Sequence, residues 1–334
     1  MENKTYSSIK IMRAFSAMAI VLMHCLPNEL RGGLSLSQTL ATGTVKSFLE
    51  FAIPVFTMIT GALLLGRDES VPRLLKRVLR IFLALLIFGT GMSFMELFFV
   101  TRAPVSSAFK AILSVFMGTS WDVLWYLYML IGLYLILPVL RKFVQNSDNA
   151  TIVFIMVVLF AGNSIIPAVN TLAGSKVIGF YLPFTNACLF YTLFGYYAFC
   201  RMEFSIKKPV LWTTVAVVMI YNAIMLTAKG SFSLTNGLLE YASPTTALLS
   251  MAIFILLKDC RFSSAFSDSI ADNSFGIYLI HCIIIQIINR LLGFYPESYP
   301  LYLSIPGFFA VVFVVSWISS AILRKVPFVG KYIL

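Results

Sequence analysis

Charged residues are scarce in this sequence. Asp, Glu, Lys and Arg together make up 12% of its 334 residues, whereas hydrophobic residues make up 59%, and the mean hydropathy is +0.90. A typical soluble domain has about a quarter charged residues and about half apolar ones. The composition therefore excludes an ordinary soluble domain and predicts a polytopic membrane protein. The net charge of +11 then indicates basic cytoplasmic loops rather than a nucleic-acid-binding surface.

Metal-binding and processing signals are also missing. The sequence has two histidines, and its five cysteines have no spacing typical of a metal or redox site, so we expect no metal. No small-residue cleavage site follows the first apolar run, and we expect that run to be retained as a span. No pair of Gly- or Pro-interrupted segments recurs in two halves, so the inverted repeat of many transporters is not indicated. Because only residues 324–334 follow the last apolar run, we expect a single integral-membrane domain over residues 1–334, without an appended soluble domain.

Ten apolar runs are long enough to cross a bilayer as helices. With the N-terminus in the cytoplasm, 17 of the 25 Lys and Arg residues fall in inner loops and 7 in outer loops, while Arg13 lies within the first span. This bias predicts an all-α bundle of about ten transmembrane helices with both termini in the cytoplasm. The runs lie near residues 10–27, 46–66, 78–100, 123–140, 151–170, 178–199, 209–228, 241–257, 273–293 and 301–323.

Arg13 and His24 are ionisable residues within the first span. A separation of eleven residues places both on one face of an α-helix, roughly 16 Å apart along its axis. Each alone could be an interfacial residue, since a long Arg side chain reaches the membrane surface. Together, on one face of an otherwise uncharged helix, they indicate function. His24 could act as a general base toward a hydroxyl, because imidazole titrates near neutral pH.

A cationic ridge leads into the third span and consists of Arg73, Lys76, Arg77 and Arg80. Two interpretations stay open. The ridge could anchor the protein to anionic membrane lipid, or it could bind a phosphorylated cytoplasmic ligand, since Arg binds phosphate in bidentate fashion.

Aromatic residues and the second histidine supply further candidates. Trp125 and Tyr126 begin an aromatic segment at the outer end of a span, where they could form an interfacial belt or line a sugar-binding mouth near His24. His281 lies near the middle of the ninth span. It could be a buried packing residue, or it could contact the substrate.

Acidic residues are rare within the spans. Glu50 and Glu96 lie at the outer ends of the second and third spans. Either carboxylate could orient His24 and stabilise its protonated form. Both could equally be ordinary interfacial acids.

Several of these residues lie in motifs that resemble acyltransferase family three, a family of membrane acyltransferases of bacterial envelope glycans. The motifs occur in order from residue 10 to about residue 285, so the likeness covers most of the chain. Thr57 and Thr60 are mild departures from the pattern of their segment. The motifs are the Arg13–His24 spacing, the segment Pro54–Gly61, the Arg77–Arg80 pair, the aromatic segment Trp125–Pro138 and the segment Phe275–His281.

The resemblance implies transfer of an acyl group, usually acetyl, from cytoplasmic acetyl-CoA to a hydroxyl of an extracytoplasmic glycan. His24 would be the catalytic histidine, and Arg13, Arg77 and Arg80 would bind the acyl donor or hold its pocket. A polar group would stabilise the oxyanion, and Asn163, Asn186 and Tyr126 are the candidates. Direct attack by the acceptor and an acyl-histidine relay both stay open.

Other relatives of this family are described as transporters or exporters, which leaves a second class of function on the same fold. A transporter could lose either Arg13 or His24, and the presence of both favours the enzyme. We expect the partners to be acyl-CoA, a glycan acceptor and membrane lipid in the cell membrane, without nucleic acid, and a homodimer stays open.

Overall fold

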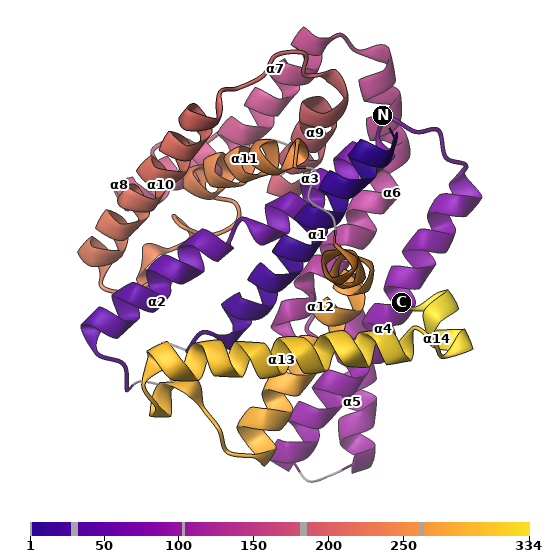
Figure 1. Cartoon of the computed structure of the whole chain (residues 1–334), viewed down its shortest axis with the longest axis vertical. Helices are drawn as coiled ribbons and strands as arrows, with labels where there is room; N and C mark the ends of the chain where they lie inside the picture. Colours follow the sequence, from indigo (N-terminus) through magenta and orange to yellow (C-terminus); the bar gives the residue numbers. More distant parts are fainter. Residues whose placement is uncertain (1, 28–32, 102–103, 181–185, 261–263) are drawn as a thin grey trace.

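The computed structural model describes residues 2–27, 33–101, 104–180, 186–260 and 264–334, and these residues form helices and turns without a strand (Figure 1). The all-α prediction is therefore confirmed. Arg31, Arg102 and Arg261, which enter the loop count, lie outside the described residues. The elements are α1 (Glu2–Cys25), α2 (Leu36–Leu49), α3 (Ala52–Leu64), α4 (Val71–Thr101), α5 (Pro104–Phe116), η2 (Asp122–Leu124), α6 (Trp125–Asn146), α7 (Asn149–Phe160), η3 (Ala161–Ile165), α8 (Ile166–Ala173), α9 (Ala187–Tyr196), η4 (Tyr197–Arg201), α10 (Lys208–Lys229), η5 (Ser233–Thr235), α11 (Pro244–Lys258), α12 (Ala265–Leu291), η6 (Pro296–Ser298), α13 (Leu301–Leu323) and α14 (Pro327–Tyr332).

Eight helical segments of the described chain are long and apolar enough to cross a membrane. Two of the ten predicted spans, 178–199 and 241–257, coincide with shorter helices, which are α9 with η4 and α11. The membrane bundle is thus confirmed, while the count of ten stays a prediction. The eight segments are Ser7–Cys25, Leu36–Leu64, Val71–Phe98, Trp125–Asn146, Asn149–Ala173, Lys208–Lys229, Ala265–Leu291 and Leu301–Leu323.

Side-chain caps fix where several helices begin. Ser35 and Ser264 each form a capping box at the N-terminus of α2 and α12, and such a box satisfies backbone N–H groups that have no partner within the helix. A turn at Glu50 and Phe51 separates α2 from α3. The second predicted span is therefore two consecutive helices, with Glu50 at their junction.

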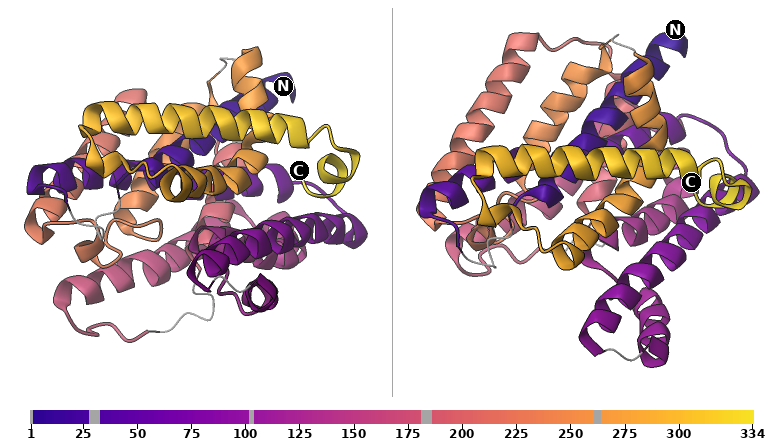
Figure 2. Two further views of the ribbon diagram at one scale, coloured as in Figure 1. Left: turned by 90° about the horizontal axis from the view of Figure 1, so that it is seen from below. Right: turned by 60° about the horizontal axis from the view of Figure 1, so that its bottom comes forward.

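The first helix is central to the bundle. α1 packs against α12, α3, α13 and α11, and it runs through the middle of the molecule in Figure 1. α13 crosses both α1 and α12, while α4 and α5 form a hairpin at one edge (Figure 2). Residues of α1 thus face several partners at once, and Arg13 and His24 are both half-buried.

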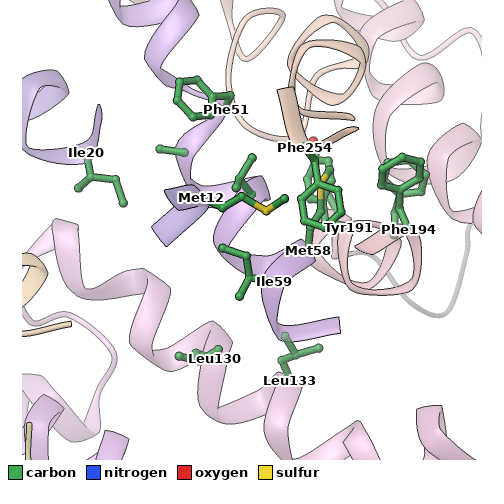
Figure 3. Packing of buried hydrophobic residues seen from close by; sticks show 14 of the residues in the cluster. Met12, Ile20, Phe51, Met58, Ile59, Leu130, Leu133, Tyr191, Phe194 and Phe254 are labelled. Carbon is green, nitrogen blue, oxygen red and sulfur yellow. The ribbon is translucent and has the colours of Figure 1, made fainter. Parts of the chain in front are cut away.

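Close packing of α3 against α9 forms part of the core. A methyl group added to Gly61 of α3 would overlap the backbone carbonyl of Thr192, and one added to Gly195 of α9 would overlap that of Met58. Small residues allow such close backbone approach between membrane helices. Beside this contact, Met58 packs against buried aromatic side chains of α9 and α11 (Figure 3).

Candidate active site

Arg13 and His24 both face α12, as their spacing predicts. The Arg13 Nη2 atom donates a hydrogen bond of 3.0 Å to the Ser274 hydroxyl. Eleven residues further along α1, the His24 ring lies 5.1 Å from the ring of His281, measured between centroids. The two side chains therefore lie along one α1–α12 interface.

The hydrogen bonding of His24 determines which ring nitrogen is basic. Its Nδ1 atom lies 2.8 Å from the carbonyl oxygen of Ile20. A carbonyl oxygen can only accept, so Nδ1 carries a hydrogen. In the neutral form of the ring, Nε2 then holds the lone pair and can take a proton from a substrate hydroxyl.

His281 is buried behind His24, with 0% of its surface exposed. Its Nδ1–H donates to the Ile277 carbonyl at 3.1 Å, and its Nε2 lies 3.1 Å from the thiol of Cys282. It is not among the described residues that line the cavities named below. Its predicted substrate contact therefore stays a prediction, and the observed contacts are those of a packing residue beside His24.

A cavity of 370 Å³ opens at His24, and we name it the histidine cavity. Polar side chains from five parts of the chain meet there. The ring of Trp125 lies 4.8 Å from that of Tyr241, measured between centroids, in a tilted arrangement, and Tyr241 belongs to the turn before α11. The lining residues are Ile20, Met23, His24, Lys46, Glu50, Ile53, Val123, Trp125, Tyr126, Phe232, Glu240, Tyr241 and Tyr278.

The two candidate carboxylates are placed differently. Glu50 is 8% exposed and lines the histidine cavity with His24. Glu96 instead lies 3.7 Å from Arg290 and lines a separate cavity of 50 Å³. Of the two, Glu50 is the carboxylate that the fold brings to the candidate base.

A second cavity, of 320 Å³, contains Arg13, Arg77 and Arg80, and we name it the arginine cavity. All four residues of the cationic ridge are exposed, but Arg73 and Lys76 are not among the described residues that line this cavity. The cationic ridge therefore divides, since only Arg77 and Arg80 border the cavity. The other lining residues are Ile20, Phe56, Ile59, Thr60, Leu63, Leu64, Ile81, Tyr126, Leu130, Tyr134, Asp272, Ser274, Phe275, Tyr278 and Leu334.

Glu69 links Arg77 of α4 to Arg141 of α6. Its carboxylate accepts a hydrogen bond of 2.9 Å from Arg77 Nε and another of 2.9 Å from Arg141 Nη2. Burial raises the pKa of Glu69, but the hydrogen bonds and positive charges of Arg77 and Arg141 outweigh it and hold the pKa below its usual value. Glu69 thus stays ionised at neutral pH and fixes the start of α4 against α6.

The arginine and histidine cavities adjoin each other. Both are lined by Ile20, Tyr126 and Tyr278, which we name the partition. The two tyrosine rings meet edge to face at 5.8 Å, and the Tyr278 hydroxyl donates to the Val123 carbonyl at 2.6 Å. Three side chains therefore separate the cationic cavity from the cavity of the base.

Of the three candidates for the oxyanion, Tyr126 alone lies at these cavities. Asn163 donates to the Leu159 carbonyl within its own helix. Asn186 caps α9 by accepting from the backbone N–H of Cys188. Tyr126 borders both cavities, so its hydroxyl is the one placed near the path between them.

Sequence reasoning missed several residues of the site. Lys46, Glu240 and Tyr241 reach the histidine cavity from α2 and from the turn before α11. Ser274 directly precedes the segment Phe275–His281 noted above, and Tyr278 lies within it. Their spacing of four residues is the signal that places both on one helix face. The described residues contain no group of three or more His, Cys, Asp or Glu side chains that could hold a metal ion.

Comparison with known proteins gives one result. The model of a family described as an acyltransferase domain matches residues 6–324 of the chain. No curated protein and no solved structure matches it. The match covers α1 to α13, and therefore every residue that lines the histidine cavity.

Proposed function

The chain belongs to acyltransferase family three, and from this premise we propose that it transfers an acyl group from cytoplasmic acyl-CoA to a hydroxyl of an extracytoplasmic glycan. Acetyl-CoA is the proposed donor, and a bacterial surface polymer is the proposed acceptor. The single observation that carries the proposal is the pair of adjoining cavities, one cationic and one containing a basic imidazole nitrogen.

The arginine cavity suits the donor. Coenzyme A carries several phosphate groups, and guanidinium groups bind phosphate through charge-assisted hydrogen bonds. Arg13, Arg77 and Arg80 would hold these phosphates at the cavity. The neutral pantetheine arm would then extend past the partition toward His24, a distance of roughly 16 Å along α1.

The chemical step follows from the geometry of His24. Its Nε2 removes the proton from the acceptor hydroxyl while the hydroxyl oxygen attacks the thioester carbonyl carbon. The new C–O bond forms, the C–S bond breaks, and His24 returns the proton to the departing thiolate of coenzyme A. When ionised, Glu50 would favour the protonated imidazole through its charge, and the Tyr126 hydroxyl would donate to the oxyanion.

The proposed location is the cell membrane, with both termini in the cytoplasm. The excess of Lys and Arg in the predicted inner loops supports this orientation. In that orientation the arginine cavity faces the compartment that contains acyl-CoA, and the histidine cavity faces the envelope.

The decisive experiment uses purified protein, radiolabelled acetyl-CoA and an envelope polysaccharide fraction as acceptor. We expect base-labile label on the polysaccharide, and we expect His24→Ala to reduce its rate by about 100-fold or more, in line with the loss of a general base. Wild-type transfer by His24→Ala at equal expression would overturn the assignment of the base. Uptake of solute into vesicles without coenzyme A would instead favour transport.

A further inference from the structure

A third cavity lies on the other side of His24, between α1, α12 and the turn around η6. Its volume is 260 Å³, and we name it the amide cavity for Gln286 and Asn289. It shares His24 and Val123 with the histidine cavity, and it shares no lining residue with the arginine cavity. The remaining lining residues are Cys25, Leu26, Trp121, Cys282, Ile285, Pro296, Glu297 and Phe308.

The three cavities therefore form a series. The arginine cavity adjoins the histidine cavity at the partition, and the histidine cavity adjoins the amide cavity at His24. A donor that enters from the arginine end would fill the first two. An acceptor that approaches from the third would reach the same imidazole without displacing the donor.

Asn289 gives the amide cavity a polar group that lacks a protein partner. The residue is 6% exposed, and its Oδ1 atom is buried without a hydrogen-bond partner. An unpaired amide oxygen in a buried, membrane-spanning segment is costly. A ligand hydroxyl that donates to this oxygen would remove that cost when the site is occupied.

The other side chains define the chemical class of the ligand. Gln286 lies one helical turn before Asn289 and lines the same cavity. Glu297 lies across from α12 in η6, which is held because the Ser304 hydroxyl donates to the Pro296 carbonyl at 2.9 Å. Trp121 adds an aromatic surface. Amide and carboxylate groups recognise hydroxyls, and an aromatic ring suits the apolar face of a sugar.

Charge and size narrow the ligand further. The described residues that line the amide cavity include no Lys or Arg and include one carboxylate, which disfavours an anionic ligand. Pockets for drug-sized ligands usually measure about 300–1,000 Å³, so the amide cavity suits a single sugar ring rather than an oligosaccharide. We propose that the amide cavity is the acceptor subsite and that Asn289 and Gln286 bind the neutral, polyhydroxylated ring whose hydroxyl His24 deprotonates.

This inference rests on the proposed acyl transfer, and its test separates acceptor binding from donor binding. We expect Asn289→Ala to raise the KM for envelope polysaccharide by about tenfold or more, as for the loss of a buried hydrogen bond. The KM for acetyl-CoA should not change. Asn222→Ala is the matched control, because Asn222 of α10 is also a buried amide whose side chain has no partner but is not among the residues that line this cavity.

Equal effects of Asn289→Ala and Asn222→Ala, or an effect on the acetyl-CoA KM alone, would overturn the subsite. The KM values of the two variants are compared only if both variants keep the thermal melting temperature of the wild type. Should Asn289→Ala fail to fold, Gln286→Ala gives the same comparison, since Gln286 is partly exposed at the cavity.

A second measurement does not depend on catalysis. The thiol of a Gln286→Cys variant is labelled with a water-soluble maleimide, and the rate is measured by peptide mapping with and without polysaccharide. We expect protection by the polysaccharide, also in the His24→Ala background. Protection without any acetyl transfer would keep the subsite and reject the proposed reaction, whereas transfer without protection would reject the subsite.

Discussion

Glu50 and Glu96 look alike in the sequence, yet the fold gives them different neighbours. Glu50 is buried in the histidine cavity, and Glu96 pairs with Arg290 elsewhere. We expect Glu50→Gln to lower kcat for acetyl transfer by about 10- to 100-fold, because the protonated imidazole loses a nearby negative charge. Glu96→Gln, the matched control, should keep kcat within about twofold of the wild type, as for most substitutions away from a site. Equal kcat values for the two variants would contradict the role of Glu50.

Two arginines of the cationic ridge, Arg80 and Arg73, can be compared in the same way. Both residues are exposed, but Arg80 lines the arginine cavity, whereas Arg73 of the same helix is not among its described lining residues. We expect Arg80→Ala to raise the KM for acetyl-CoA by about tenfold or more, since a hydrogen bond to a charged group contributes about 1.5–3 kcal/mol. Arg73→Ala should leave this KM nearly unchanged. Steady-state kinetics with varied acetyl-CoA measure both KM values. Equal KM values for the two variants would favour the interpretation that the cationic ridge anchors the protein to membrane lipid.

At the scale of helix pairs, the contact between α3 and α9 depends on two glycines. Gly195→Ala places a methyl group against the Met58 carbonyl, and Gly61→Ala places one against Thr192. The helices would have to move apart, and we expect each variant to lower stability by about 1–3 kcal/mol. Thermal unfolding in detergent measures the change.

Gly132→Ala provides the control for that measurement. A methyl group on Gly132, within α6, would meet no atom within 4 Å. Alanine favours the helix over glycine by about 0.5–1 kcal/mol, so this variant should be as stable as the wild type or slightly more stable. A loss of stability in Gly132→Ala equal to that of Gly195→Ala would show that the backbone contact is unimportant.

At the scale of helices, some features of the site can be predicted from the sequence and others cannot. The shared face of Arg13 and His24 follows from helix periodicity, which is a local property, and both side chains do face α12. The break at Glu50 and Phe51 also has a local signal, because Pro54 in the first turn of α3 has no N–H to donate to the Glu50 carbonyl. Tyr241 and Glu50 line the same cavity although they are far apart in the chain, and no local sequence pattern predicts such a long-range contact. Asn289 likewise becomes a candidate residue only because it lines a cavity, which the sequence does not reveal.

At the scale of the whole molecule, orientation and span count are open to experiment. We expect reporter fusions at both termini to indicate the cytoplasm, since basic residues concentrate in the predicted inner loops. A reporter inserted after Gly174, which ends α8 in the left-handed conformation, should indicate the outside. Termini on opposite sides would show that one of the ten predicted spans, 178–199 or 241–257 above all, does not cross the membrane.

The partition of Ile20, Tyr126 and Tyr278 matters beyond the reaction itself. An open passage through this bundle would leak protons and ions and dissipate the gradients that energise the cell. Aromatic side chains packed edge to face oppose such leakage. The proposed donor would have to insert its uncharged pantetheine arm between them in each turnover, while a hydrated cation would have to lose its water against these side chains.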